Sequence, residues 1–108
     1  MHFVTHNEKP DIDVNCTSLV GYVDTGYDIL RRAFGEPTSG CDKSDAEWLL
    51  EFADGKVATV YNYKDGWNYC GSSGLPVQAI TYWHIGGHDA VVAGRVQELI
   101  KVAEQKEE

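Results

Sequence analysis

The stretch DAEWLLEFADGKVATVYNYKDG, residues 45–66, decides the fold. Residues 47–52 have the two-residue period of a strand with one buried face. One alternating set is large and apolar: Trp48, Leu50 and Phe52. Asp54-Gly55 predicts a two-residue hairpin turn, and residues 56–63 predict the returning strand. Residues 47–63 are therefore expected to form an antiparallel hairpin.

A helix over residues 27–34 is expected before this hairpin. Thr25 and Asp28 have the spacing of a capping box at its start. Gly35 and Pro37 mark its end, since glycine favours a helix C-cap and proline prevents continuation. One side of the helix carries an apolar stripe of Tyr27, Leu30 and Phe34.

Two more strands and a second helix complete the pattern. Residues 18–23 (SLVGYV) and 80–85 (ITYWHI) are the strands, and Asp89 is placed to cap the last helix. That helix has an apolar face of Val92, Val96, Leu99, Ile100 and Ala103. The order β-α-β-β-β-α predicts an α+β fold, with a mostly antiparallel four-stranded sheet and two helices.

The chain of 108 residues is expected to be a single domain, residues 1–108. Residues 1–16 are polar and weakly patterned, which suggests a flexible lead-in or an edge strand. Residues 36–45 are expected to form a loop, and residues 104–108 a frayed tail. Because one domain of this size encloses little volume, we expect a homo-oligomer.

The net charge of −8 is concentrated in the first half of the chain. Residues 1–54 contain 11 acidic and 4 basic residues, whereas residues 55–108 contain 6 and 5. Nucleic-acid binding needs lysine and arginine, so direct binding to DNA or RNA is disfavoured. The acidic half either serves solubility or docks on a basic groove of a partner protein.

The sequence has no membrane-length apolar run and no signal-like N-terminus. Cys16, Cys41 and Cys70 are scattered and odd in number, which favours reduced thiols inside a cell. The four histidines have no metal-ligand spacing. We therefore expect a protein without a metal or cofactor that acts at neither a membrane nor a disulfide-rich cell exterior.

A candidate ligand-binding site lies in residues 57–87, which hold six of the nine tyrosine and tryptophan residues. Aromatic faces with polar groups between them suit a flat or ring-shaped ligand. Lys64 is expected to contact a phosphate or carboxylate. The candidate ligand-binding residues are Asn62, Tyr63, Lys64, Asp65, Trp67, Tyr69, Trp83 and His84.

A catalytic role for this region is a weaker interpretation. His84 could act as a general base with Asp65 or Cys70, but no spacing links these residues. By alternation, Trp83 and Ile85 share one face of their strand, while Tyr82 and His84 share the other. We therefore expect no catalytic residues and no enzyme.

Five segments together resemble a family of small proteins encoded by bacteriophages and prophages. They are TSLVGY (17–22), FGEPT (34–38), DAEWLLEF (45–52), VATVYNYKDG (57–66) and WHIGG (83–87). The resemblance covers roughly residues 17–87, most of the chain, and supplies no catalytic residues. It implies an accessory protein that counters host defences in the cytoplasm of a bacterium.

Two functions fit that context. The first is a non-enzymatic sponge that sequesters a small nucleotide-like signal, such as a cyclic nucleotide or cyclic ADP-ribose. The alternative is an anti-CRISPR-type inhibitor that binds a host defence protein and blocks its nucleic-acid site. The residues that would carry this alternative are Asp42, Asp45, Glu47 and Glu51.

Overall fold

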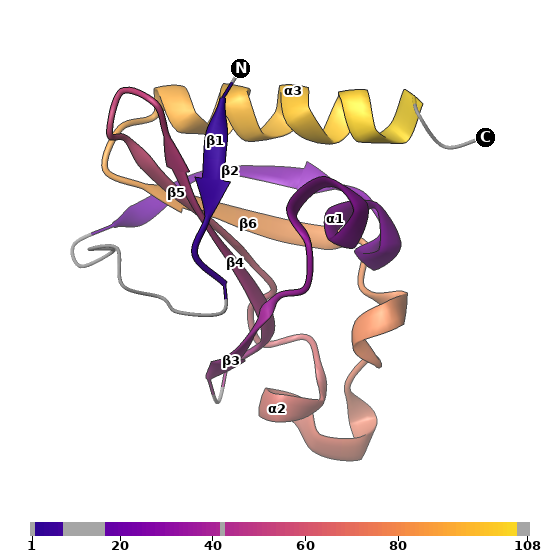
Figure 1. Cartoon of the computed structure of the whole chain (residues 1–108). Coiled ribbons are helices and arrows are strands. Elements are labelled where there is room, and N and C mark those ends of the chain that lie inside the picture. The colour runs from indigo at the N-terminus through magenta and orange to yellow at the C-terminus, as the bar shows by residue number, and fades with distance from the viewer. Residues whose placement is uncertain (1, 8–16, 42, 106–108) are drawn as a thin grey trace.

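The computed structural model describes residues 2–7, 17–41 and 43–105. It is an α+β fold built on an antiparallel sheet (Figure 1). The strands are β1 (Phe3–Thr5), β2 (Ser18–Asp24), β3 (Thr38–Cys41), β4 (Ser44–Phe52), β5 (Val57–Tyr61) and β6 (Tyr82–Gly87). The α-helices are α1 (Tyr27–Phe34), the one-turn α2 (Trp67–Cys70) and α3 (Val91–Gln105). Single 3₁₀ turns lie at Gly71–Ser73 and Val77–Ala79.

The sheet is larger than the sequence predicted. Five strands lie side by side in the order β1-β4-β5-β6-β2. The sixth strand, β3, also pairs with β4 but is not part of this order. The expectation of four strands and two helices was therefore wrong, although the α+β class and the antiparallel pairing are confirmed. The extra strands are short: Phe3–Thr5 lies in the stretch expected to be a flexible lead-in or an edge strand, and Thr38–Cys41 lies in the stretch expected to be a loop. The other lead-in residues, 8–16, and the tail residues 106–108 lie outside the described residues, whereas residues 104 and 105 are helical.

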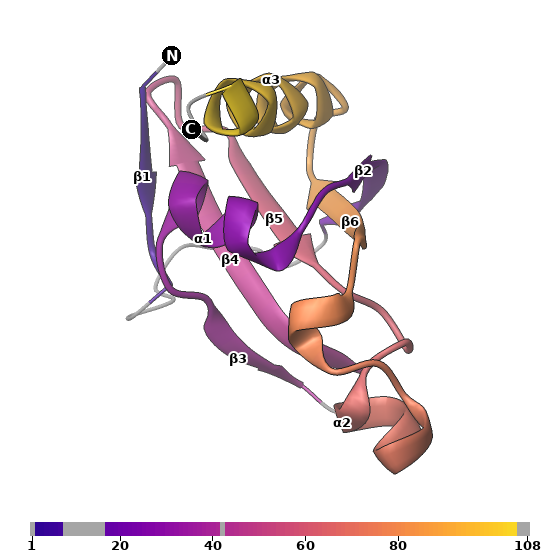
Figure 2. The ribbon, with the colours of Figure 1, turned by 90° about the vertical axis from the view of Figure 1, so that its right-hand side faces the viewer.

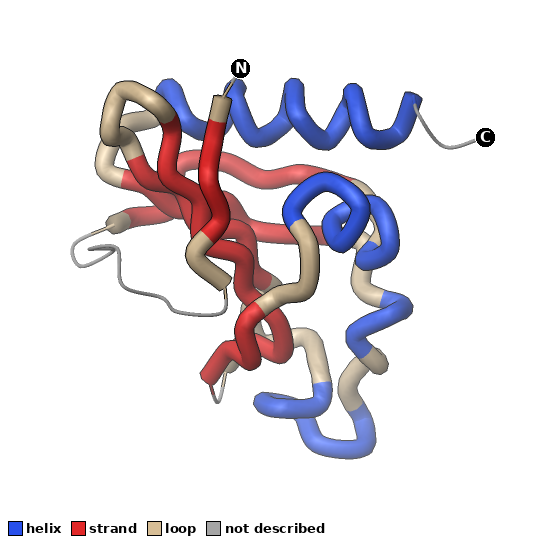
Figure 3. Tube along the Cα trace, viewed as in Figure 1, coloured by secondary structure: helices blue, strands red, loops and turns tan. Residues whose placement is uncertain are grey.

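Helices α1 and α3 cover one face of the sheet. Figure 3 shows α3 lying above the strands, and Figure 2 shows α1 in front of β4. Between helices and sheet lies one apolar core, whose largest fully buried side chains are Trp48, Trp83, Leu30, Leu50, Ile80, Ile85 and Ile100. The predicted helix stripes contribute to it through Leu30, Phe34, Val92, Val96 and Ile100. The described helices contribute side chains to this one core, and none of them contributes to a second core on the opposite face of the sheet.

The hairpin between β4 and β5 differs from the predicted two-residue turn. Gly55 N–H donates to the carbonyl of Phe52, and Phe52 N–H donates to the carbonyl of Lys56. Gly55 has a φ of 87°, a left-handed conformation that glycine adopts at no steric cost. This is a longer turn with a glycine bulge.

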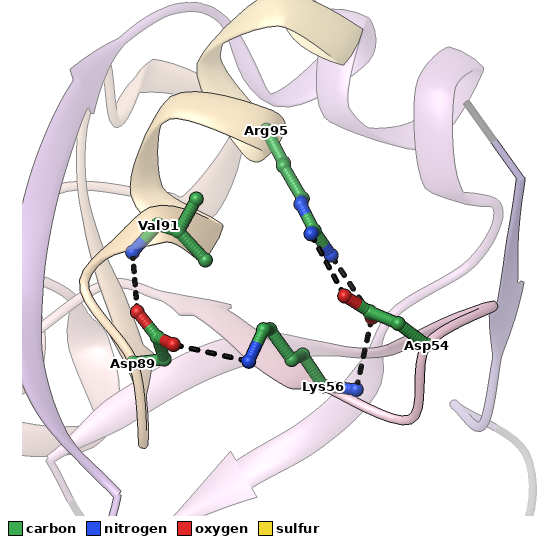
Figure 4. Close-up of polar contacts among 5 residues, drawn as sticks. All are labelled: Asp54, Lys56, Asp89, Val91 and Arg95. Carbon is green, nitrogen blue, oxygen red and sulfur yellow. Dashed lines mark hydrogen bonds and ion pairs between the residues drawn. The ribbon is translucent and has the colours of Figure 1, made fainter.

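Ion pairs attach this turn to the start of α3 (Figure 4). Arg95 donates to both carboxylate oxygens of Asp54, at 3.0 and 2.8 Å, and Lys56 Nζ lies 3.0 Å from Asp89 Oδ2. The hydrogen bonds from Arg95 lower the pKa of Asp54 to about 2. Asp89 also accepts a 3.0 Å hydrogen bond from Val91 N–H, so its predicted capping role is confirmed.

The start of α1 is held differently from the prediction. Its N-cap is Gly26 without a side-chain cap, so the predicted capping box of Thr25 and Asp28 is wrong. The hydroxyl of Thr25 instead donates to Glu104 Oε2 at 3.0 Å, which links the end of α3 to the start of α1. At the other end, Gly35 is the C-cap as predicted, with its N–H bonded to the carbonyl of Arg31.

The N-terminal strand is fastened to the core by two side chains. Phe3 packs against the rings of Phe34 and Phe52. Asn7 is buried and accepts from Leu49 N–H, while its amide donates to the carbonyl of Phe34. The edge-strand interpretation therefore holds for residues 3–5.

Among the described residues, no helix combines the length and apolar character needed to cross a membrane. Among these described residues, no three or more His, Cys, Asp or Glu side chains are grouped so that they could hold a metal ion.

Candidate ligand-binding site

The sheet face opposite α1 and α3 carries an aromatic cluster that we call the tyrosine face. It consists of Tyr22, Tyr61, Tyr63, Tyr82 and His84. Strand register explains the gathering, because Tyr22 of β2 and Tyr61 of β5 both pair with His84 of β6. Residues directly opposite on neighbouring antiparallel strands place their side chains on the same face. The tyrosine face is therefore a product of the fold's topology.

Four tyrosine rings surround the imidazole of His84. Tyr61 stacks on it with 5.5 Å between centroids and an interplanar angle of 16°. Tyr22 is tilted at 5.1 Å, and Tyr63 and Tyr82 meet the imidazole edge-on at 5.6 and 5.8 Å. Tyr22 and Tyr82 also stack on each other at 5.2 Å. These distances are typical of favourable aromatic pairs, so the rings support one another's positions.

Three of these rings present much of their surface to solvent. Tyr22 and Tyr82 are each 44% exposed and Tyr63 is 42% exposed, whereas Tyr61 and His84 are partly covered. Several exposed rings grouped on one surface indicate an interaction site more strongly than a single exposed ring does. Flat rings with hydroxyl groups at their edges can stack on an aromatic ligand and hydrogen-bond to its rim.

His84 lies in the middle of the tyrosine face and is favoured in its neutral form. Its Nδ1 is buried and has no hydrogen-bond partner within the described part of the chain. Burial lowers the pKa of His84 below its usual value, and the nearby Asp65 carboxylate opposes this shift only in part. A proton on Nδ1 would make it a buried donor without an acceptor, which costs free energy. The hydrogen-bond environment of His84 therefore also favours the neutral imidazole.

The lowered pKa of His84 predicts a pH dependence of stability. In the unfolded chain histidine gains its proton near pH 6.5, whereas folded His84 resists it. The unfolded state then binds more protons, so the free energy of unfolding should decrease as the pH falls below about 6.5. Urea unfolding at pH 7.5, 6.5 and 5.5 would measure this slope. His84→Phe, which keeps an aromatic ring, should have a shallower slope, and equal slopes for both proteins would contradict the prediction.

Lys64 lies at one end of the tyrosine face in an unusual backbone conformation. Its φ is 61°, in the left-handed region that costs a non-glycine residue about 1 to 2 kcal/mol. Its N–H donates to the carbonyl of Lys43 at 2.8 Å, and its carbonyl accepts from Cys70 Sγ at 3.2 Å. Its Nζ lies 5.2 Å from the ring centroids of both Tyr63 and Tyr69. Backbone strain that the surrounding contacts maintain is common at binding sites.

The ligand-binding residues predicted from the sequence do not all lie together in the structure. Tyr63, Lys64, Tyr69 and His84 form one connected group of ring and cation contacts. Asp65 adjoins it through its effect on the pKa of His84. Trp83 is fully buried on the opposite face, where its indole N–H donates to the carbonyl of Thr25 at 3.1 Å. Trp83 is thus a core residue in this structure.

Asn62 is also fully buried and organises the loop after β5. Its side-chain oxygen accepts from the N–H groups of Asp45 and Ala46, at 2.8 and 3.1 Å. Its amide nitrogen donates to Asp45 Oδ1 and to Asp65 Oδ1, both at 3.0 Å. These four hydrogen bonds all join Asn62 to other groups of the protein. Asn62 therefore contributes to a ligand site by holding the turn at Lys64 in its conformation.

Three of the four acids proposed for partner docking, Asp45, Glu47 and Glu51, lie at alternating positions of β4 and therefore on one face of that strand. Asp42 lies outside the described residues. Asp45 packs closely on Gly66, where a Cβ atom would lie 2.1 Å from Asp45 Oδ1. Glu51 is hydrogen-bonded to His6 at 3.1 Å. Glu47 pairs with Tyr61 in the sheet, and burial raises the pKa of Glu47.

Of the residues in the catalytic alternative, Asp65 lies close enough to His84 to oppose the lowering of its pKa, and Nδ1 of His84 has no hydrogen-bond partner in the described part of the chain. Cys70 is a free thiol whose Sγ is directed at the carbonyl of Lys64.

Sequence reasoning missed three members of the tyrosine face: Tyr22, Tyr61 and Tyr82. Alternation along 80–85 did place Tyr82 beside His84. The pairing of β2 with β6 and of β6 with β5 brings Tyr22 and Tyr61 to them, and that pairing was not readable from the sequence.

Comparison with models of known protein families and with curated proteins finds no match to this chain.

Proposed function

We propose that this protein is a non-enzymatic binding protein that sequesters a small nucleotide-like ligand on the tyrosine face. The base would stack on the exposed rings of Tyr22, Tyr82 or Tyr63, and a phosphate would contact Lys64. The observation that carries the proposal is the connected set of exposed rings that ends in a cation. Lys64 Nζ lies over the ring of Tyr63 at 5.2 Å from its centroid, and that ring lies edge-on to the imidazole of His84.

The energies of these contacts are suitable for a weak to moderate site. Stacking on an aromatic side chain is worth about 1–3 kcal/mol per base. A charge-assisted hydrogen bond between Lys64 and a phosphate would add about 1.5–3 kcal/mol. Because ordering the ligand opposes these gains, one open face by itself favours micromolar to millimolar affinity. A second copy of the chain facing the first would enclose the ligand, so the sponge is proposed to be a homo-oligomer.

The proposed setting follows from the resemblance to phage-encoded proteins. A sponge for a cyclic nucleotide or cyclic ADP-ribose would silence a host defence that uses such a signal, and it would act in the bacterial cytoplasm. The alternative, an acidic inhibitor of a defence protein, would use Asp45, Glu47 and Glu51, which share one face of β4. The exposed rings of the tyrosine face favour the sponge over this alternative.

A capture-and-release assay tests the proposal. The protein is mixed with a panel of cyclic mononucleotides, cyclic dinucleotides and cyclic ADP-ribose isomers, filtered, and then heated. Liquid chromatography with mass spectrometry identifies compounds lost from the filtrate and recovered on heating. A compound recovered unchanged supports a sponge, and one recovered altered shows an enzyme. If no compound is depleted, the proposed function is wrong.

Two substitutions connect a captured compound with the tyrosine face. Lys64→Gly should weaken binding about tenfold while the fold is retained, because glycine accepts the φ of 61° without strain. Tyr22→Ala should weaken it by a similar factor through lost stacking. Isothermal titration calorimetry provides both affinities. Lys101→Gln removes the same charge from the exposed surface of α3 and should bind as the wild type does; equal affinity in all three variants would place the ligand elsewhere.

A further inference from the structure

A groove that shares no residue with the tyrosine face lies where α1, β3, β4 and α2 meet. It has a volume of about 380 Å³. Two aromatic residues, Tyr27 and Trp67, and two acidic residues, Glu36 and Asp45, are among those that line it. Thr38 and Gln78 add a hydroxyl and an amide. This volume lies within the range of small-ligand pockets, and its polar groups are mainly hydrogen-bond acceptors.

One rim of the groove already holds a guanidinium of the same chain. Arg31 forms an ion pair with Glu36, and its Cζ lies 5.8 Å from the ring centroid of Tyr27. The guanidinium thus combines a carboxylate contact with a ring contact. This pair shows which chemistry the aromatic and acidic walls favour.

The other wall offers the same two kinds of group. Trp67 is 56% exposed, and its indole N–H donates to the carbonyl of Gly74 at 3.1 Å, which restrains the ring. Asp45 accepts from the Asn62 amide at 3.0 Å through Oδ1 and from Asn68 N–H at 3.3 Å through Oδ2. A carboxylate has about four acceptor positions, so Asp45 retains the capacity to bind a further donor.

We propose that this groove binds a guanidinium group, which stacks on Trp67 and donates hydrogen bonds to Asp45. A guanidinium fits better than an ammonium because it is planar and carries five donors in a fixed fork. Thr38 and Gln78 can accept from its remaining N–H groups. The net charge of −8 draws cations toward the protein. The ligand is either a small guanidino compound or an arginine side chain of another protein.

Trp67 provides the signal for the test, because Trp48 and Trp83 are both fully buried. Ethylguanidinium is titrated into the protein up to about 50 mM, the range expected for one small cationic group. The expected result is a saturable change in tryptophan emission. Ethylammonium should bind about fivefold more weakly, and the neutral isostere ethylurea should cause no saturable change. No saturation by ethylguanidinium, or an equal response to ethylurea, would overturn the proposal.

Charge variants assign the signal to the groove. Asp45→Asn should weaken ethylguanidinium binding at least tenfold, and Glu36→Gln, whose side chain lies at the exposed rim, should weaken it a few fold. Glu98→Gln removes an exposed acid from α3, away from the groove, and should bind as the wild type does. If Asp45→Asn does not fold, the Glu36→Gln and Glu98→Gln pair decides, and equal binding by those two would contradict the proposal.

Two further probes distinguish the sources of the guanidinium. N-acetyl-arginine-methylamide carries the side chain alone, and a nine-residue peptide with one central arginine adds its neighbours. A peptide that binds at least tenfold more tightly than the capped amino acid indicates an arginine of a protein. Equal affinities indicate a small guanidino compound. Because the groove and the tyrosine face share no residue, this proposal can fail without affecting the proposed sponge function.

Discussion

Replacing Asn62 by alanine is expected to lower the free energy of unfolding by about 2–4 kcal/mol. The side-chain oxygen of Asn62 accepts from the N–H groups of Asp45 and Ala46, and Asn62 is fully buried. Alanine would leave the buried N–H of Ala46 without a partner, and each such group costs about 1–3 kcal/mol. Asp45 and Asp65 would also lose the amide that lies between them.

Urea unfolding followed by circular dichroism measures this change. Asn68→Ala is the matched control, because Asn68 is exposed although its amide donates to the carbonyl of Ser44 at 3.0 Å. Asn68→Ala should lower the free energy of unfolding by about 1 kcal/mol or less. Asn62→Asp keeps the accepting oxygen but adds a buried carboxylate beside Asp45 and Asp65, so at neutral pH it should be at least as destabilising as Asn62→Ala. Similar stabilities for Asn62→Ala and Asn68→Ala would contradict the structural role of Asn62.

Replacing Trp83 by alanine is expected to cost about 3–5 kcal/mol, the range for a buried tryptophan. Its indole packs edge-on against Trp48 at 5.4 Å and also contacts the ring of Tyr27 at 6.4 Å. The substitution would open a cavity in the centre of the core and leave the carbonyl of Thr25 without the indole N–H. A domain of this size has about 5–15 kcal/mol of stability in total, so this variant should be close to unfolded.

Trp67→Ala is the matched control for this experiment, since Trp67 is the exposed tryptophan of the described region. It should cost about 1 kcal/mol or less in the same urea assay. Trp83→Phe should have an intermediate effect, because it retains a ring but loses the indole N–H. Equal losses at positions 83 and 67 would show that Trp83 does not lie in the core.

The sequence was sufficient for the elements whose pattern is local. The stripe of α1, the hairpin of β4 and β5 and the Asp89 cap each depend on residues a few positions apart. Of the two short strands added to the predicted sheet, Thr38–Cys41 was missed and Phe3–Thr5 was expected only as one of two alternatives. Both pair with the edge of β4 that β5 leaves free. A three- or four-residue segment carries too little periodicity to predict such pairing.

The candidate site was predicted only in part for a related reason. Tyr63, Lys64 and Tyr69 lie close in sequence and also meet in the structure. Asn62 and Trp83 were selected for residue type, but burial decides their roles. Trp83 lies on the sheet face that the helices cover, whereas Asn62 is buried against the segments at Asp45 and Asp65 that it hydrogen-bonds. Tyr22 joins His84 only through the pairing of β2 with β6.

The position of β2 at an edge of the sheet has a consequence for folding during synthesis. In the order β1-β4-β5-β6-β2, the one neighbour of β2 is β6, and Val23 of β2 pairs with Trp83 of β6. A ribosome adds about 5–20 residues per second, so β2 waits roughly 3–12 seconds for its partner strand to be made. During this interval the apolar side chains of β2 have no strand to pair with. Chaperones that bind nascent chains should therefore recognise residues 18–24 until β6 emerges from the ribosome.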